Sequence, residues 1–224
     1  MLTFQRAGWG SAVAVSRFWY VLHKTTAPPT GVATSGDIEC RLATIDDRRS
    51  FSAFTLRRPA DELAAWVREE ATWVFVAFAE GRAVAYDCVT RHLPRYPPFS
   101  AMRLAADEVW VRDAYTVPEL RQRRLGRTVR AYRNAAMRAL GVRRTLSATA
   151  EDNVASLVAG YDGAMSKVDG LAYRRVLCFR HVRYHEDVRA RLDALVSRVR
   201  GSAAVRAPAT LAACFAADGT GTRT

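Results

Sequence analysis

The stretch TVPELRQRRLGR, Thr116 to Arg127, follows an apolar, strand-like run over residues 108–115 and leads into a helix-like run over residues 125–140. A strand that turns through a basic, glycine-containing loop into a helix start can hold a phosphate, because free backbone N–H groups and the helix dipole point at the anion. Five arginines lie between Arg121 and Arg130, with no acidic residue among them. The stretch therefore predicts a site for a multiply charged phosphate compound.

The composition predicts a packed, basic protein. Of 224 residues, 50% are hydrophobic and 10% aromatic, which favours a folded core over disorder. The formal net charge is +12, and only Lys24 and Lys167 are lysines, so 34 − 2 leaves 32 arginines. Two explanations remain open, a GC-rich genome that replaced lysine by arginine, or binding to nucleic acid or anionic lipid. The arginines are scattered along the chain, which favours the first.

Cysteine spacing and hydropathy bear on the compartment. The four cysteines are far apart in the sequence and form no C-x-x-C pair: Cys40, Cys88, Cys178 and Cys214. This spacing favours small core residues or free thiols of a reducing compartment. It does not provide a zinc site. No apolar run is long enough to span a bilayer, and Arg17 interrupts the longest candidate, residues 11–22. We expect a cytoplasmic protein without a transmembrane segment. An interfacial helix at a membrane is the minor alternative.

Hydrophobic periodicity predicts three regions. An aromatic-rich helix is expected over residues 1–24 and a Pro/Gly/Thr linker over residues 25–36, so that residues 1–36 form a helical extension and linker. A compact domain follows over residues 37–184. Residues 185–224 are expected to hold a C-terminal helix and a loose tail.

Within the compact domain, strands and helices alternate irregularly. Strands are expected over residues 38–43, 72–79, 83–90, 108–115, 144–149, 164–168 and 173–182. Helices are expected over residues 46–56, 60–70, 125–140, 153–159 and 186–200, with Asp152 or Asn153 as a cap. This order predicts an α/β (α+β) domain with a mostly antiparallel sheet and one βαβ-like crossover.

Two motifs in this order carry a family resemblance. The segment DAYTVPELR, Asp113 to Arg121, resembles the D-L-Y-V-x-P-E-Y-R segment of the GNAT superfamily of acyl-CoA-dependent N-acyltransferases. Downstream, EDNVAS, residues 151–156, is similar to the family's E-x-N-x-x-S/A. The resemblance covers about residues 37–184 in both element order and motif.

The resemblance implies a fold and a cofactor. It implies a mixed, mostly antiparallel sheet of six to seven strands flanked by about four helices, with a splay between the two central parallel strands. Acetyl-CoA, as acyl donor, would lie in that splay. The implied cofactor-binding residues are Tyr115, Thr116, Val117, Arg121, Arg123, Arg124, Leu125, Gly126, Arg127, Thr128, Asn153 and Ser156. Among them, the backbone of Thr116 and Val117 would pair with the pantetheine arm, and the N–H groups of residues 123–128 would face the pyrophosphate.

Three positions depart from the family pattern. Arg124 stands where the family has its first loop glycine, a residue that lets the backbone approach a phosphate closely and at positive φ. Gly160 stands where many members carry a tyrosine that reprotonates the leaving thiolate, and Tyr161 follows one residue later. Arg112 stands where polyamine acetyltransferases of the superfamily carry a glutamate.

The chemistry requires a neutral amine, a donor for the thioester oxygen and an acid for the thiolate. Asp113 shares a strand face with Tyr115 and is a candidate base or orienting group, and a buried aspartate capping a loop is an equal alternative. The Val117 N–H is the candidate donor. Tyr161 is the candidate acid, with a core aromatic as the alternative. Glu108 is expected to be solvent-exposed.

Other polar residues favour no additional site. His181 and His185 lie four residues apart but lack a third ligand signal, so surface histidines are favoured over a metal pair. Residues 91–96 either border the acceptor pocket or form an ordinary proline-rich crossing loop.

The sequence thus predicts an N-acetyltransferase that moves an acetyl group from acetyl-CoA to a primary amine of a small-molecule or protein acceptor by direct attack in a ternary complex. The first alternative is a catalytically degenerate CoA-binding or sensor module, which the substitutions at Arg112 and Gly160 keep open. An arginine-rich nucleic-acid-binding protein ranks last, because no interleaved aromatic and basic pattern or helix-turn-helix is evident. A homodimer is left open.

Overall fold

A computed structural model describes residues 13–24, 38–95, 99, 102–150, 153, 156–157, 165–176, 179–185, 190 and 192–193. Its strands are β1 (Val13–Lys24), β2 (Ile38–Leu42), β3 (Thr72–Ala79), β4 (Arg82–Thr90), β5 (Glu108–Thr116), β6 (Arg144–Ala150), β7 (Met165–Val176) and β8 (Phe179–His185). Its α-helices are α1 (Ala60–Arg68) and α2 (Leu125–Ala139), and its 3₁₀ helices are η1 (Ile45–Phe54) and η3 (Pro118–Leu120).

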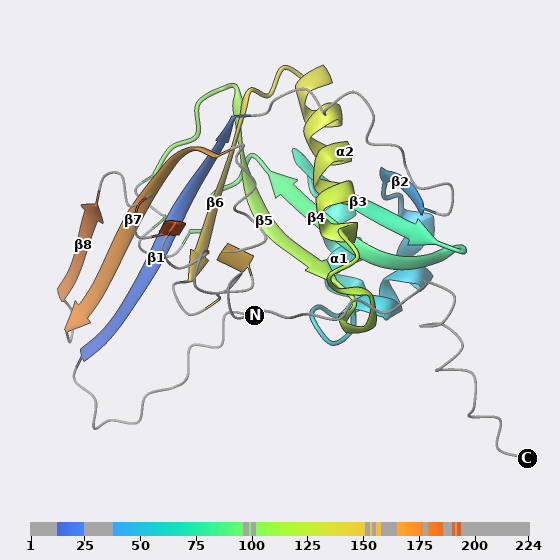
Figure 1. Cartoon of the computed structure of the whole chain (residues 1–224), viewed down its shortest axis with the longest axis horizontal. Coiled ribbons are helices and arrows are strands. Elements are labelled where there is room, and N and C mark those ends of the chain that lie inside the picture. The colour runs from blue at the N-terminus through green and yellow to red at the C-terminus, as the bar shows by residue number, and fades with distance from the viewer. Residues whose placement is uncertain are drawn as a thin grey trace, which may run out of the picture.

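The strands form one eight-stranded sheet in the order β2-β3-β4-β5-β6-β1-β7-β8 (Figure 1). Every neighbouring pair is antiparallel except β5 and β6, which are parallel. The β3–β4 hairpin forms locally, because Glu80 and Gly81 both adopt positive φ, as a two-residue turn between twisted antiparallel strands requires. The mixed sheet and its central parallel pair agree with the expected α/β fold class.

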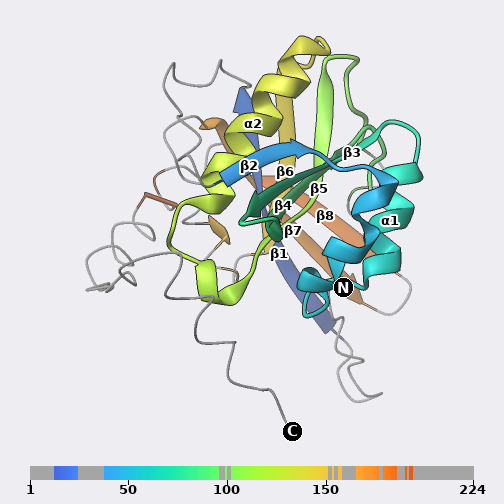
Figure 2. The same ribbon diagram turned by 90° about the vertical axis from the view of Figure 1, so that its right-hand side faces the viewer.

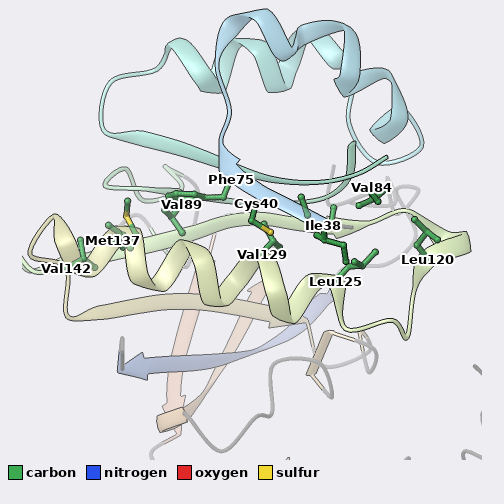
Figure 3. Close-up of a cluster of buried hydrophobic side chains, with 14 residues drawn as sticks. Ile38, Cys40, Phe75, Val84, Val89, Leu120, Leu125, Val129, Met137 and Val142 are labelled. Carbon is green, nitrogen blue, oxygen red and sulfur yellow. The ribbon is translucent and has the colours of Figure 1, made fainter. Parts of the chain in front are cut away.

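The sheet separates two layers of helix (Figure 2). Alternation along β4 sends Ala85 and Val89 to the face covered by α2, and Tyr86 and Cys88 to the opposite face, which η1 and α1 cover. Figure 3 shows the first of these interfaces, where Leu125, Val129 and Met137 of α2 meet buried side chains of β2, β3 and β4. The two layers place the start of α2 and the loop before α1 on opposite sides of the sheet.

Strands β5 and β6 part soon after they meet. Only three residue pairs join them, from Glu108 opposite Arg144 to Trp110 opposite Leu146. Beyond that point β5 continues to Thr116 beside β4, while β6 continues to Ala150 beside β1. The diverging ribbons are visible in Figure 1. The splay expected between the central parallel strands is therefore present.

The helix expected over residues 1–24 is wrong where the structure describes this segment, because residues 13–24 form strand β1. This strand lies between β6 and β7 and is antiparallel to both. Both edges of its backbone are thus hydrogen-bonded by segments more than 100 residues away, and this tertiary pairing overrides the local pattern. Since β1 joins the sheet, the sheet has eight strands instead of the expected six to seven.

The remaining elements lie close to their expected positions. Six of them begin at the predicted residue, namely β2, α1, β3, β5, α2 and β6. The two weak strands expected near the C-terminal end are the longer hairpin β7–β8. The helices expected over residues 153–159 and 186–200 fall largely outside the described residues. No helix in the described part of the chain is long and apolar enough to cross a membrane.

Candidate functional site

The backbone groups that face the splay follow from the pairing of β4 with β5. The Val117 N–H donates to the Val84 carbonyl at 3.0 Å, in register with Ala85 opposite Thr116. Hydrogen-bonded and non-hydrogen-bonded pairs alternate in an antiparallel ladder. Tyr115 therefore directs its N–H and C=O toward β4, whereas Ala114 and Thr116 direct theirs to the other side, where the splay opens.

This alternation corrects the role expected for Val117. Its N–H is already bonded to Val84, and its carbonyl accepts the Leu120 N–H at 3.1 Å, so neither group is available to a ligand in the splay. The Thr116 carbonyl instead accepts a hydrogen bond from Arg121 Nε at 3.3 Å on the side away from β4. The Ala114 N–H donates to Asp113 Oδ1 at 3.1 Å, so the Ala114 carbonyl and the Thr116 N–H remain to form the open backbone edge, of which sequence reasoning named only Thr116.

A β-bulge shapes β5 just before this edge. Cys88 pairs with Asp113 and Val89 pairs with Val111, which leaves Arg112 as an extra residue. The bulge places Arg112 and Asp113 on the same face, where Arg112 lies 4.3 Å above the Trp66 ring and pairs with Glu69 of the α1 layer. Arg112, at the position of the missing glutamate, is therefore an ion-paired residue.

The loop between β5 and α2 turns through two left-handed residues. Gln122 has φ of 67° and Arg124 has φ of 61°, and Arg124 directly precedes the first residue of α2. Left-handed backbone is what glycine permits without a steric penalty. Arg124 therefore keeps the backbone conformation that the family pattern assigns to glycine, and adds a guanidinium to the loop.

The first turn of α2 closely approaches the end of β5. A Cβ on Gly126 would lie 3.3 Å from Thr116 Oγ1, so a side chain there would crowd the strand. The N–H groups of Arg127 and Thr128 both donate to the Arg124 carbonyl, whereas Leu125 and Gly126 donate to no backbone group in the described chain. Helix N-termini with such free N–H groups bind anions. This small, basic cradle suits a pyrophosphate.

Asn153 begins the next helical turn. Its carbonyl oxygen Oδ1 accepts the Ser156 N–H at 3.2 Å, and its backbone carbonyl accepts the Leu157 N–H at 3.1 Å. The expectation that Asn153 acts as an N-cap is confirmed. The side chain of Asn153 is exposed, so its amide nitrogen stays accessible beside the end of β6.

Asp113 lies at the centre of a buried ionic cluster on the α1 face. Arg57 donates to its two oxygens from Nε at 3.2 Å and from Nη2 at 2.6 Å. Arg58 Nε donates at 2.9 Å, and the hydroxyl of buried Tyr86 donates at 2.9 Å. Burial alone would raise the pKa of Asp113, but the hydrogen bonds and charges of the two arginines outweigh it and hold that pKa below its ordinary value.

These contacts argue against Asp113 as a general base. A carboxylate with a lowered pKa that accepts from two arginines, a tyrosine hydroxyl and the Ala114 N–H is a weak proton acceptor. The alternative of a buried aspartate is closer to what is found, although Asp113 binds two arginines of the segment before α1 instead of capping a loop. Glu108 is also corrected, because it is buried, accepts the Ala105 N–H at 2.9 Å and pairs with Arg144 at 2.9 Å.

Three aromatic rings adjoin the cluster. Phe54 contacts the ring of Tyr86 with centroids 4.9 Å apart, and both lie 6.2 Å from the ring of Tyr115. Arg121 from the basic loop lies 5.6 Å above the Tyr115 ring. Tyr115 therefore stands between the basic loop and the ionic cluster.

Sequence reasoning missed Arg57, Arg58 and Tyr86. The two arginines lie more than 50 residues before Asp113, and no motif or spacing relates them. Gly160 and Tyr161 lie outside the described residues, and the strand that carries His181 and His185 is β8. In the described part of the chain, no cluster of three or more metal-ligating side chains is found.

No protein-family model matches the sequence, and no curated protein matches it either. Solved structures with a similar fold include the aminoglycoside N-acetyltransferase AAC(6')-Iy in complex with CoA, with 16% identity, a TM-score of 0.44, and 56% of this chain and 85% of that one covered. The ribosomal-protein-S18-alanine N-acetyltransferase from Escherichia coli has 14% identity and a TM-score of 0.44, and the match covers 56% of this chain and 75% of that one. A protein of the GNAT family from Novosphingobium aromaticivorans has 15% identity and a TM-score of 0.49, and the match covers 78% of this chain and 66% of that one. The chain is similar to these acetyltransferase structures over part of its length, with identities of 16% or less and TM-scores below 0.5.

Proposed function

We propose that this protein is an acetyl-CoA-dependent N-acetyltransferase acting on a primary amine. One observation carries the proposal. The parallel strands β5 and β6 separate after three residue pairs, and the free edge of β5 ends beside the basic N-terminus of α2. A chain that binds an extended thioester needs an unpaired backbone edge for its arm and an anion site for its diphosphate, and both occur here together.

The residues around the splay suit each part of that donor. Bound acetyl-CoA would supply an activated acetyl group as a thioester. The Ala114 carbonyl and the Thr116 N–H would bind its amide-bearing arm in the manner of an added strand. The N–H groups of Leu125 and Gly126, with the guanidinium groups of residues 121–127, would neutralise its phosphates.

The amine must reach the thioester from the opposite face, where Tyr115 and the ionic cluster lie. We propose that the amine loses its proton to water near this cluster, and that Asp113 positions the arginines. Tyr161 stays our candidate for returning a proton to the thiolate.

A second candidate function is a CoA-binding module without catalysis. It is favoured by one observation, the engagement of the carboxylates nearest to the β5 bulge. Asp113 is bound by Arg57 and Arg58, and Glu69 by Arg112. A protein in this state could bind the cofactor without deprotonating an amine efficiently.

Two measurements test these functions. Acetyl-CoA at a hundred times its Kd would stabilise the native state by about 2.7 kcal/mol, which thermal melting detects readily. Gly126→Val should abolish the shift by filling the cradle, whereas a surface variant such as Arg82→Gln should retain it. Absence of any shift in the unmodified protein contradicts both candidates. Release of free thiol with a panel of amines then separates the enzyme from the module, since the module binds acetyl-CoA without amine-dependent release.

A further inference from the structure

We propose that Arg57 binds a negatively charged group of the acceptor, so that the acceptor is a small amine carrying a carboxylate or a phosphate. This inference rests on the proposed function and concerns the face of the splay opposite α2. In this proposal Arg57 determines which acceptors bind, and the buried carboxylate of Asp113 holds the Arg57 side chain in position.

The ionic cluster is graded in its exposure to solvent. The side chain of Asp113 is 4% exposed, that of Arg58 is 17% exposed, and that of Arg57 is 40% exposed. The buried carboxylate thus forms the floor of the cluster, and Arg57 is its solvent-facing member. An arginine held from beneath by a buried carboxylate loses little side-chain entropy when it binds a ligand, because its orientation is already fixed.

The geometry leaves one edge of Arg57 available. Its Nε and Nη2 atoms donate to Asp113, and the guanidinium also lies beside the Tyr86 hydroxyl, but no hydrogen bond from Nη1 to a carboxylate is found in the described part of the chain. The charges also differ between the two arginines. Arg58 pairs both with Asp113 and with Glu62, at 3.1 Å, so its charge is shared between two acids. Arg57 is therefore the guanidinium group best suited to bind an incoming anion.

The distance to the splay sets the size of the acceptor. Asp113 and Tyr115 lie on the same face of β5, two residues or about 7 Å apart along the strand. Ala114 lies between them and presents its backbone to the splay. An anion on Arg57 therefore lies within several ångströms of an amine at the open edge, which fits an amino acid or a phosphorylated amino sugar. The half-buried ring of Tyr115, which packs on the buried ring of Phe54, would contact the apolar part of such a molecule.

The same cluster selects against acceptors with several positive charges. Arg57, Arg58 and Arg112 all lie on this face, and their acidic partners are already engaged. A polyamine would find no free carboxylate in this cluster to pair with its ammonium groups, because Asp113, Glu62 and Glu69 already bind the three arginines.

The test compares pairs of acceptors that differ only in the anion. Suitable pairs are phenylalanine with phenethylamine, and glucosamine 6-phosphate with glucosamine, assayed by thiol release with acetyl-CoA. In the unmodified protein, kcat/KM should be about ten- to a hundred-fold higher for the anionic member of a pair, the range expected for a charged hydrogen bond. The carboxylate and phosphate arms distinguish the two sources of the anion.

Substitutions at Arg57 assign the effect. Arg57→Gln should lower kcat/KM for the anionic acceptor by about ten-fold or more relative to the neutral member of the pair, mainly through KM, while Arg57→Lys restores part of the preference. The matched control is Arg48→Gln, which removes an exposed arginine of η1 paired with Asp61 and should change neither value. The acetyl-CoA thermal shift confirms that each variant is folded.

The outcomes separate this inference from the proposed function. Equal turnover of anionic and neutral amines overturns the inference and leaves the acetyltransferase in place. If no amine is turned over, the thermal shift of the CoA-bound protein with N-acetylphenylalanine and N-acetylglucosamine 6-phosphate decides. A shift that Arg57→Gln removes supports the anion site, and the absence of a shift in the unmodified protein overturns it.

Discussion

Arg124 shows how one residue can meet a backbone requirement normally met by glycine. Its φ of 61° places it in the left-handed region, which costs an L-residue roughly 1–2 kcal/mol. Gln122, two residues earlier, carries the same kind of strain with φ of 67°. Two strained residues in one short loop are consistent with a site that holds a ligand close to its backbone.

We expect Arg124→Gly to leave the free energy of unfolding within about 1 kcal/mol of its original value, because relief of backbone strain offsets the greater freedom of glycine in the unfolded chain. The Kd for CoA should rise about two- to five-fold through loss of one exposed cation, and this difference should vanish in 1 M salt. Isothermal titration with CoA at two salt concentrations measures the Kd and its dependence on salt. Gln122→Gly is the uncharged control and should leave the Kd unchanged.

Asp113 gives a prediction for pH dependence. Its pKa is lowered in the folded protein, so its ion pairs contribute stability above its ordinary pKa near 4, and that contribution is lost as pH falls through the lower folded value. Asp113→Asn should therefore destabilise the protein by about 2–3 kcal/mol from pH 5 to pH 8, and by progressively less below pH 4. Urea unfolding at pH 7, 5 and 3 measures this gap. A gap that stays constant down to pH 3 contradicts the ionised pair.

At this scale the sequence predicted only part of the site. The order of residues along the chain predicts the basic loop and its Gly126. It also predicts that Asp113 and Tyr115 lie on the same face of their strand, as they do in the structure. The partners of Asp113 did not follow, because Arg57 reaches it only after the chain has folded back across β5.

Among the elements, α2 is fixed to the sheet by a buried ion pair as well as by apolar contacts. Arg133, 1% exposed, donates from Nη1 to both oxygens of Asp87 on β4 at 2.8 Å. Asn134 Oδ1 accepts further hydrogen bonds from the same guanidinium. Because α2 begins at the basic loop, this ion pair also helps to hold the N-terminus of α2 in place beside the end of β5.

Breaking this pair on one side should be more harmful than removing it whole. Arg133→Met leaves Asp87 buried and unpaired, and should lower the free energy of unfolding by about 3–5 kcal/mol. The double variant Arg133→Met with Asp87→Leu should recover most of that loss, because no charge then stays buried. Urea denaturation of Arg133→Met, of Asp87→Leu and of the double variant gives the coupling energy between the two side chains. A double variant as unstable as the single one would show that the pair stabilises the fold by geometry and not by charge.

Element boundaries were the most predictable level. The strong periodicity of Thr72–Ala79 and Leu125–Ala139 gave their starting residues, since long amphipathic or apolar runs have few alternative structures. The bulge at Arg112 was not predictable, because an extra residue in a strand leaves the local pattern of side chains almost unchanged.

At the scale of the whole molecule, β1 joins the β2–β6 part of the sheet to the β7–β8 hairpin. It pairs with β6 from Phe18 to Lys24 and with β7 from Val13 to His23. The sequence did not predict this, because a largely apolar and aromatic run such as Val13–Lys24 is compatible with either helix or strand, and only its distant partners decide.

Removing residues 1–24 should therefore affect the entire sheet. We expect the shortened chain to melt at least about 10 °C lower, equal to about 3–5 kcal/mol, and to aggregate through the newly open edges of β6 and β7. Thermal melting and light scattering measure both. A synthetic peptide of residues 11–24 should restore part of the melting temperature. An unchanged melting point would mean that β6 and β7 close on each other without β1.

The position of β1 also has a consequence for synthesis on the ribosome. Lys24 pairs with Arg144, so 144 − 24, or 120, residues must be added before the first partner of β1 emerges. At about 5–20 residues per second, that takes about 6–24 s. During this interval the largely apolar strand β1 has neither neighbour, which makes it a natural substrate for a chaperone. Translation pauses or chaperone depletion should therefore impair this protein more than one whose strands pair in the order of synthesis.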